Sequence, residues 1–492
     1  MQFKDHTIEE IDSIMNKAWK AFPIYRNTSL ADRASFMKAI AVELENAGDE
    51  LIHTAMQETN LPEARLRGER GRTIFQLNSY ADACLQGNWL AATIDTAIPE
   101  KTPPKPDIRK MQVPLGPVVV FGSSNFPFAY STAGGDTASA LAAGCPVIVK
   151  AHPAHPHTST LVANAILTAA TKCKMPDGVF AHIYGTSFEI GKALVMHPFT
   201  KAVGFTGSFT GGKQLFDWSN QRKEPIPVFA EMGSVNPVFL LPDKLTTDCA
   251  QIALMYAGSI TLGAGQFCTN PGLIIGIESA ALQKFIHDLG KAIQQIAASK
   301  MLHNGIIKAY KEKKAAALLQ EDVHLVAESS SAVDSLEALP TIATTTANAF
   351  LQNPLLHQEV FGPFSLVIRC QDMAQMVEVA QKMEGQLTAT IMTSNEEFSK
   401  NPELVEAIQN ICGRFILNSV PTGVEVCLSM QHGGPYPAST DSRFGSVGAD
   451  SIGRFCRPLA FQNWHNDLLP AALKDENPLK LWRRVNNEPS KN

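Results

Sequence analysis

Cys268 has the surroundings in this 492-residue chain that best suit covalent chemistry. It lies in the segment Leu262-Gly-Ala-Gly-Gln-Phe-Cys-Thr-Asn-Pro-Gly272, where most neighbours are small or polar. Backbone amides near such a glycine-rich turn can stabilise a thiolate and, later, an oxyanion. A cysteine without this context is most often a small buried hydrophobic residue, and we assign that role to the other eight. Cys268 is therefore the candidate nucleophile.

Two other polar residues stand where strands are expected to end. Glu231 ends one strand-like run, and Asn125 follows the apolar run at 118–121. Taken alone, the Glu is a solvated or capping carboxylate and the Asn is a turn residue. Beside a reactive thiol, a carboxylate can serve as a general base and an amide as a neutral hydrogen-bond donor.

A glycine-rich turn at 207–214, Gly-Ser-Phe-Thr-Gly-Gly-Lys-Gln, nearly matches the phosphate-binding pattern G-x-x-x-x-G-K-[S/T]. Its last residue, Gln214, lacks the hydroxyl that would bind Mg²⁺, which argues against a nucleoside-triphosphate site. The turn can still hold a phosphate, because free amides at a helix start point toward the anion. The alternative is a turn that merely needs glycines. The dinucleotide fingerprint G-x-G-x-x-G is absent, since Cys268 stands where its third glycine would be.

Other catalytic patterns are weak or missing. His152, His155 and His157 lie in one proline-containing segment, but the chain has no H-E-x-x-H motif and no cysteine spacing that would complete a metal site. We expect solvated loop histidines there and no metal. The absence of G-x-S-x-G argues against a serine hydrolase.

The elements that must position these residues alternate between strand and helix. Short apolar runs and helix-length segments follow one another at 118–121, 147–149, 159–172, 179–183, 187–197 and 202–205. This alternation predicts a parallel sheet covered on both faces, with ligands at the carboxyl ends of its strands. Residues 7–100 are expected to be mostly helical, beginning with a capping box at 7–10. A second α/β series follows Glu231, and residues 329–350, rich in Ser, Thr and Ala, are expected to form a surface excursion.

Composition restricts the class of protein. With 45% apolar and 18% charged residues the chain is typical of a globular protein, and at ~150 residues per domain its length suggests roughly three domains. The net charge of −5, without a basic block, argues against nucleic-acid binding. The nine cysteines form no C-x-x-C pair and no secreted disulfide pattern. The charged start is unlike a signal peptide and no stretch suits a membrane span, so we expect a cytoplasmic protein with reduced thiols.

Taken together and in order, several segments resemble the aldehyde dehydrogenase superfamily. They are Asn125-Phe-Pro127, Val147-Ile-Val-Lys150, Gly204-Phe-Thr-Gly-Ser208, Glu231-Met-Gly-Ser-Val-Asn-Pro237, Gly265-Gln-Phe-Cys268 and Glu359-Val-Phe-Gly-Pro363. The resemblance implies an α/β fold with a Rossmann-like nucleotide-binding domain at 1–230, helical over 1–100, and a catalytic domain at 231–425. A C-terminal segment at 426–492 would return to the nucleotide-binding domain and form the interface of a homodimer or homotetramer.

The resemblance also implies a role for each matched residue. Cys268 matches the family nucleophile, Glu231 its general base and Asn125 its oxyanion donor. The residues matched to cofactor contacts are Lys150 (adenosine ribose), Gly207 and Ser208 (pyrophosphate), and Glu359 and Phe361 (nicotinamide ribose). The implied reaction is the NAD(P)-dependent oxidation of an aldehyde. The thiolate forms a thiohemiacetal, hydride loss leaves a thioester, and Glu231 activates the water that hydrolyses it.

Three departures narrow this expectation. Pro153 stands where many relatives have a Glu that binds ribose hydroxyls, so Lys150 would face a 2′-phosphate unopposed; we expect NADP use, with NAD possible. The segment after Pro127 lacks the Trp-Lys of many relatives, and residues 431–441 replace a G-G-x-K-x-S-G motif. The last two features resemble the branch of 2,5-dioxovalerate (α-ketoglutaric semialdehyde) dehydrogenases, whose product is 2-oxoglutarate.

That branch implies a substrate with a carboxylate, which an arginine would bind. The sequence leaves six candidates open: Arg65, Arg67, Arg70, Arg72, Arg414 and Arg443. One alternative function is a dehydrogenase of medium- or long-chain aliphatic aldehydes, with Phe126 and Phe128 as pocket walls. Two others are a cofactor-free thiol esterase using Cys268 and Glu231, and a non-catalytic protein that kept the fold.

Overall fold

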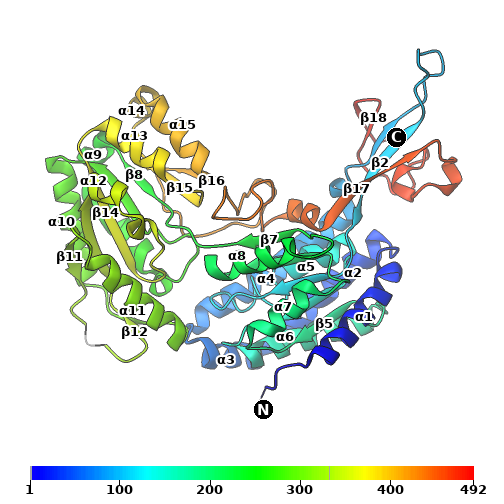
Figure 1. The fold of residues 1–492 in the computed structure, drawn as a ribbon, viewed down its shortest axis with the longest axis horizontal. Coiled ribbons are helices and arrows are strands. Elements are labelled where there is room, and N and C mark those ends of the chain that lie inside the picture. Colours follow the sequence, from blue (N-terminus) through cyan, green and yellow to red (C-terminus); the bar gives the residue numbers. More distant parts are fainter. Residues whose placement is uncertain (1–2, 332, 492) are drawn as a thin grey trace.

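The computed structural model describes residues 3–331 and 333–491, so residues 1, 2, 332 and 492 of the predicted domain ranges lie outside the described residues. Helices and strands alternate along most of the chain, and the described strands form two five-stranded sheets, one seven-stranded sheet and one two-stranded sheet (Figure 1). This arrangement confirms the predicted α/β class. Within the described ranges, no helix has the length and apolar character needed to cross a membrane.

Four helices precede the first large sheet: α1 (Ile8–Tyr25), α2 (Leu30–Asn46), α3 (Gly48–Thr59) and α4 (Glu63–Gln86). The predicted capping box is present, since the Thr7 amide donates to the Glu10 carboxylate at 2.8 Å and the Glu10 amide donates to the Thr7 hydroxyl at 3.2 Å. The prediction of helix up to residue 100 is wrong in its last part. Gly87 closes α4 with a φ of +66°, a left-handed cap that favours glycine, and strand β1 (Thr93–Asp95) follows.

The first large sheet is parallel and has both faces covered. Its strand order is β5-β4-β3-β6-β7. The strands are β3 (Val118–Phe121), β4 (Val147–Lys150), β5 (Phe180–Ile183), β6 (Ala202–Thr206) and β7 (Val228–Glu231). The connecting helices are α5 (Gly135–Ala143), α6 (Pro156–Lys172), α7 (Phe188–Met196) and α8 (Phe209–Asn220). Val118 and Val120 of β3 enter one hydrophobic core and Val119 and Phe121 another, as the alternating directions of strand side chains require.

The second large sheet has the strand order β11-β13-β14-β9-β8-β15-β16, and all neighbours pair in parallel except β11 and β13. The strands are β8 (Val238–Leu240), β9 (Leu273–Ile277), β11 (His324–Glu328), β13 (Thr341–Thr346), β14 (Phe364–Cys370), β15 (Gln386–Met392) and β16 (Cys412–Leu417). Its helices are α9 (Pro242–Thr261), α10 (Ala280–Gln294), α11 (Asn304–Leu318), α12 (Ala347–Gln352), α13 (Met373–Lys382), α14 (Asn395–Lys400) and α15 (Pro402–Ile411).

The expectation of a surface excursion at 329–350 is wrong, because this segment contains β13. That strand lies between β11 and β14, and its residues Ile342 and Ala343 are completely buried. β-Branched residues such as Thr fit a pleated strand, and their hydroxyls can be satisfied inside the sheet. The Thr344 hydroxyl, for example, donates to the carbonyl of Val367 at 3.0 Å.

The third sheet projects from the body of the molecule, at the upper right of Figure 1. It joins β1 and β2 (Ile108–Pro114) to three strands from the end of the chain, β17 (Cys456–Gln462), β18 (Arg483–Val485) and β19 (Glu488–Ser490), in the order β17-β2-β1-β18-β19. The chain after β16 therefore returns to the N-terminal half of the molecule. A two-stranded sheet of β10 (Ser299–Lys300) and β12 (Glu337–Ala338) completes the set among the described residues.

Candidate active site

A cleft of about 480 Å³ lies at the carboxyl ends of β3, β6 and β7. Ligands of parallel sheets bind at this edge. Loops of the second-sheet region and residues of α11 complete its wall. Seven of the eight predicted site residues line it: Asn125, Gly207, Ser208, Glu231, Cys268, Glu359 and Phe361. The eighth, Lys150, ends β4 and does not line the cleft.

A glycine turn places Cys268 in the cleft. Residues 263–265 all lie in the left-handed region, with φ values from +56° to +66°. A Cβ at Gly265 would overlap the backbone of Gly362, so only glycine allows this close approach. The approach packs the Cys268 loop against the loop that follows Glu359.

Asn236 fixes the other side of the Cys268 loop. Its Nδ2 donates to the carbonyls of Cys268 and Asn270, both at 2.9 Å, and its Oδ1 accepts from the Thr388 hydroxyl at 2.9 Å. Asn236 belongs to the same motif as Glu231. That motif therefore positions the nucleophile as well as the carboxylate.

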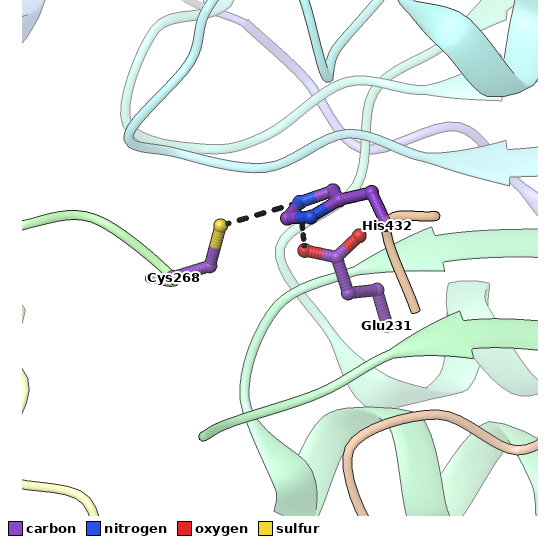
Figure 2. Close-up of side chains that lie close together, drawn as sticks. All are labelled: Glu231, Cys268 and His432. Atoms are coloured by element: carbon purple, nitrogen blue, oxygen red, sulfur yellow. Dashed lines mark hydrogen bonds and ion pairs between the residues drawn. The ribbon is translucent and has the colours of Figure 1, made fainter. Parts of the chain in front are cut away.

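Cys268 and Glu231 line the cleft, and the buried side chain of His432 lies against both of them, as Figure 2 shows. Nε2 of His432 lies 3.5 Å from Sγ of Cys268 and 3.1 Å from Oε1 of Glu231. The Ser446 hydroxyl donates to the second carboxylate oxygen, Oε2, at 2.8 Å. His432 and Glu231 are only 1% and 4% exposed, so their contact is shielded from water. One imidazole nitrogen thus faces both the candidate nucleophile and the carboxylate.

The surroundings shift the pKa values of the two acidic groups in opposite directions. Burial, together with the negative charges of Glu231 and Glu359, raises the pKa of the Cys268 thiol well above its ordinary value. Burial alone would also raise the pKa of Glu231, but the charge of His432 and hydrogen bonds from His432, Ser446 and Cys268 outweigh it and lower that pKa. The thiol therefore needs a proton acceptor before it attacks, whereas the carboxylate is ionised at neutral pH.

Asn125 is buried beside the loop that leads to Cys268. Its Nδ2 donates to the carbonyl of Gln266 at 3.1 Å, which leaves the second N–H of this amide for another acceptor. Arg65 donates to the backbone carbonyl of Asn125 at 2.7 Å, and its guanidinium lies over the rings of Phe126 and Phe267 at 4.9 and 4.8 Å. The side chain of Asn125 is therefore held beside the loop that carries Cys268.

The outer part of the cleft fits a nicotinamide dinucleotide. Ser208 caps α8 by accepting from the Gly211 amide at 3.3 Å, and the remaining free amides of this helix start suit a pyrophosphate. Glu359 lies in the wall of the cleft that the region of the second sheet forms, and burial raises its pKa to about 7. A Cβ at Gly233 would lie 2.6 Å from the Glu359 carboxylate, so the missing side chain makes room for this carboxylate.

Lys150 has a carboxylate near it that the sequence motif does not reveal. Burial lowers the pKa of Lys150, and the charge of Asp5 opposes that shift. The Asp5 carboxylate is held at the start of α7, where it accepts from the Thr186 amide at 3.0 Å and the Ser187 amide at 3.4 Å. The negative charge of Asp5 therefore acts on Lys150, and whether Lys150 favours a 2′-phosphate stays a prediction.

The sequence interpretation missed His432 and Ser446. The departure from the usual motif at 431–441 marked the segment, but the contact between Cys268 and His432 spans 164 positions. The interpretation of the other histidines as solvated is wrong for His155. That residue is completely buried, with Nε2 2.9 Å from the carbonyl of Ser123.

The six candidate arginines fall into two groups. Three form ion pairs with surface carboxylates: Arg67 with Asp49 and Glu63, Arg70 with Glu45, and Arg443 with Asp441. Among the described residues, Arg65, Arg72 and Arg414 have no carboxylate within ion-pair distance. Arg72 donates to the Tyr130 hydroxyl at 3.2 Å, and the charge of Arg414 acts to lower the pKa of Cys268. Each member of this second group therefore interacts with Cys268 or with a residue that lines the cleft.

Comparison with known proteins agrees with the geometry. The sequence model of the aldehyde dehydrogenase family matches residues 1–450. Alpha-ketoglutaric semialdehyde dehydrogenase 2 of Azospirillum brasilense is 46% identical over 475 residues, which are 96% of this chain and 90% of that protein. The alpha-ketoglutaric semialdehyde dehydrogenase of Acinetobacter baylyi is 43% identical over 486 residues, covering 98% of this chain and 92% of that protein. The solved structure of 1-pyrroline-5-carboxylate dehydrogenase from Thermus with bound NAD superposes with a TM-score of 0.79 at 21% identity, covering 93% of this chain and 86% of that one. The chain belongs to the aldehyde dehydrogenase family.

Proposed function

We propose that this protein oxidises α-ketoglutaric semialdehyde (2,5-dioxovalerate) to 2-oxoglutarate through a covalent intermediate on Cys268. The observation that carries the proposal is the convergence of Cys268, His432 and Glu231 at the cleft that Cys268 and Glu231 line. Two relatives that are 46% and 43% identical over nearly the whole chain carry this substrate in their names.

The first half of the reaction forms a bond between sulfur and carbon. With His432 in its Nδ1–H tautomer, the lone pair of Nε2 takes the thiol proton, and the thiolate of Cys268 attacks the aldehyde carbon. The new Nε2–H then donates to Oε1 of Glu231. The second N–H of Asn125 and a backbone amide stabilise the oxyanion. A bound nicotinamide dinucleotide supplies the hydride acceptor. Loss of hydride from the thiohemiacetal leaves a thioester on Cys268.

The second half releases the acid. Glu231 takes a proton from water, and the resulting hydroxide adds to the thioester carbon. The carbon–sulfur bond then breaks, and the product carboxylate leaves. Since the pKa of Glu231 is lowered, the carboxylate is already ionised at neutral pH and needs no prior proton loss.

The charges around the cleft support an anionic aldehyde and a phosphorylated cofactor. Arg72 and Arg414 lie on the nucleophile side without carboxylate partners among the described residues, and they would attract the carboxylate of the substrate. Lys150 supports NADP, because Pro153 replaces the family Glu, while Asp5 keeps NAD acceptable. We also propose that the domain boundaries lie after residues 230 and 425. The protein would form a homodimer or homotetramer through the projecting third sheet.

The test is the absorbance of reduced cofactor with 2,5-dioxovalerate. Cys268→Ala should lose at least about 10³-fold of the turnover. The matched control is Cys427→Ala, since Cys427 is an exposed cysteine outside the cleft and its replacement should leave the rate unchanged. Equal rates for the Cys268 variant and the native protein would overturn the mechanism. Higher kcat/KM for uncharged aliphatic aldehydes would favour the aliphatic alternative, and ester hydrolysis without nucleotide would favour the esterase.

A further inference from the structure

Three donor atoms of different chemical types meet beside the reaction centre. Sγ of Cys268, Nε2 of His432 and Oε1 of Glu231 all lie within 4.8 Å of one another. The sulfur-to-nitrogen distance is 3.5 Å and the nitrogen-to-oxygen distance is 3.1 Å. Apart from its contacts with His432 and Cys268, Oε1 has no hydrogen-bond partner among the described residues, and Glu231 is only 4% exposed. A buried carboxylate oxygen with a free lone pair is thus aimed at the other two donors (Figure 2).

These separations resemble the edges of a zinc tetrahedron. Zn²⁺ binds sulfur at about 2.3 Å, imidazole nitrogen at about 2.0–2.1 Å and carboxylate oxygen at about 2.0–2.2 Å, so the two edges would be about 3.6 and 3.4 Å. The sulfur-to-nitrogen edge already has this length, and the nitrogen-to-oxygen edge is slightly short. The sulfur-to-oxygen edge is shorter than 4.8 Å.

The chemistry of the donors selects zinc over harder cations. Thiolate and imidazole are ligands of Zn²⁺, whereas Mg²⁺ and Ca²⁺ prefer oxygen. The Ser446 hydroxyl, at 2.8 Å from Oε2, fixes the orientation of the Glu231 carboxylate as an outer partner does in zinc sites. Cys268 and Glu231 line the cleft and Cys268 is partly exposed, so an ion can enter and leave from that side.

We propose that Zn²⁺ binds reversibly to Cys268, His432 and Glu231 and holds the enzyme inactive. The ion replaces the thiol proton and takes the sulfur lone pair that would attack the aldehyde. It also engages the carboxylate that would activate water. Zinc and aldehyde should therefore compete. The inference shares its site with the proposed function, but its binding measurements need no turnover.

Alkylation of the native protein gives the first test. The reduced full-length chain is treated with iodoacetamide, and the labelling rates of Cys268 and Cys427 are followed by mass spectrometry in the same sample. Saturating Zn²⁺ should slow labelling of Cys268 at least about tenfold, and a chelator should restore it, because a metal-bound thiolate is a poor nucleophile. Exposed Cys427 should be unaffected. Equal slowing at both cysteines, or no slowing at Cys268, would overturn the proposal.

Cobalt titration gives the second test, since Co²⁺ bound to a thiolate absorbs in the near ultraviolet. The native protein and Cys427→Ala should bind one Co²⁺ per chain with this band. Cys268→Ala should lose the band, and His432→Gln should bind at least about tenfold more weakly. A band that survives in Cys268→Ala would refute the site. Zinc binding without aldehyde turnover would refute the proposed function alone, and turnover that Zn²⁺ does not inhibit would refute this inference alone.

Discussion

The Sγ atom of Cys268 lies 3.5 Å from Nε2 of His432. The contact provides a proton acceptor for a thiol whose pKa burial and two carboxylates raise. The same nitrogen lies 3.1 Å from Glu231, so the carboxylate can stabilise the imidazolium that forms. His432 comes from the segment at 431–441 that departs from the usual family motif.

Replacing His432 by Gln should slow the first half of the reaction by about 10²–10⁴-fold, the usual effect of losing a general base. The measurement is the pre-steady-state appearance of reduced cofactor. The difference in rate between His432→Gln and the native protein should become smaller at alkaline pH, because the thiolate of Cys268 then forms without a general base. His324→Gln, which changes an exposed histidine of β11, is the matched control. An unchanged burst in His432→Gln would show that another group accepts the proton.

Arg414 should recognise the charge of the substrate. A charge-assisted hydrogen bond contributes about 1.5–3 kcal/mol, so Arg414→Gln should raise KM for 2,5-dioxovalerate by about 10- to 100-fold. KM for pentanal, which has no carboxylate, should change little. Arg443→Gln removes an exposed arginine paired with Asp441 and should affect neither substrate. If Arg414→Gln raised KM equally for 2,5-dioxovalerate and pentanal, the substitution would instead have caused a structural defect.

Glu359 should make the stability of the cofactor-free protein depend on pH. Burial raises its pKa from 4.5 to about 7, so between these values the folded chain holds a proton that the unfolded chain has released. The stabilising contribution is fully present below pH 4.5 and is lost as the pH rises through about 7. It amounts to at most about 3 kcal/mol. Glu359→Gln should therefore raise the denaturation midpoint at pH 8 relative to that of the native protein. Glu312→Gln, which changes an exposed glutamate, is the control. If the midpoints of Glu359→Gln and the native protein differed by the same amount at every pH, the raised pKa of Glu359 would be contradicted.

The sequence predicts what depends on short segments. The apolar runs at 118–121 and 202–205 form strands, because each alternates its side chains into two cores. The glycine-rich context of Cys268 likewise marks a turn whose left-handed residues the structure shows. The Ser-, Thr- and Ala-rich composition at 329–350 misled the prediction, because β13 is buried by its neighbours in the sheet and not by its own hydrophobicity.

Long-range contacts explain the remaining failures. Asp5 reaches the Lys150 region through hydrogen bonds to Thr186 that span 181 positions. His432 reaches Cys268 across 164 positions. Neither pairing leaves a local pattern of spacing or periodicity, and both depend on how the first and last segments pack on the first sheet. The groups that lie near Lys150 and Cys268 are therefore set by the tertiary structure, and short sequence patterns do not reveal them.

Asp5 should limit the preference for NADP. Its carboxylate repels a 2′-phosphate near Lys150, and a repulsion of about 1 kcal/mol corresponds to roughly fivefold in affinity. Asp5→Asn should raise the ratio of kcat/KM for NADP to that for NAD about fivefold, while the amide oxygen still accepts from Thr186. Asp12→Asn changes another exposed N-terminal carboxylate, paired with His197, and should leave the ratio unchanged. A ratio that Asp5→Asn does not alter would place the 2′-phosphate away from Lys150.

Gly265 should be necessary for the position of Cys268. Its φ of +66° disfavours any side chain, and a Cβ there would overlap backbone atoms of Gly362, which cannot rotate away as a side chain can. Gly265→Ala should therefore lower the free energy of unfolding by more than about 2 kcal/mol and displace the nucleophile, with a loss of about 10²-fold in kcat. Gly258→Ala is the matched control, because nothing lies within 4 Å of an added Cβ at this position in α9. Alanine at 258 should stabilise the helix by about 0.5–1 kcal/mol and leave kcat unchanged. Urea denaturation and steady-state kinetics of the two variants distinguish these outcomes, and equal behaviour would show that the contact with Gly362 does not position the thiol.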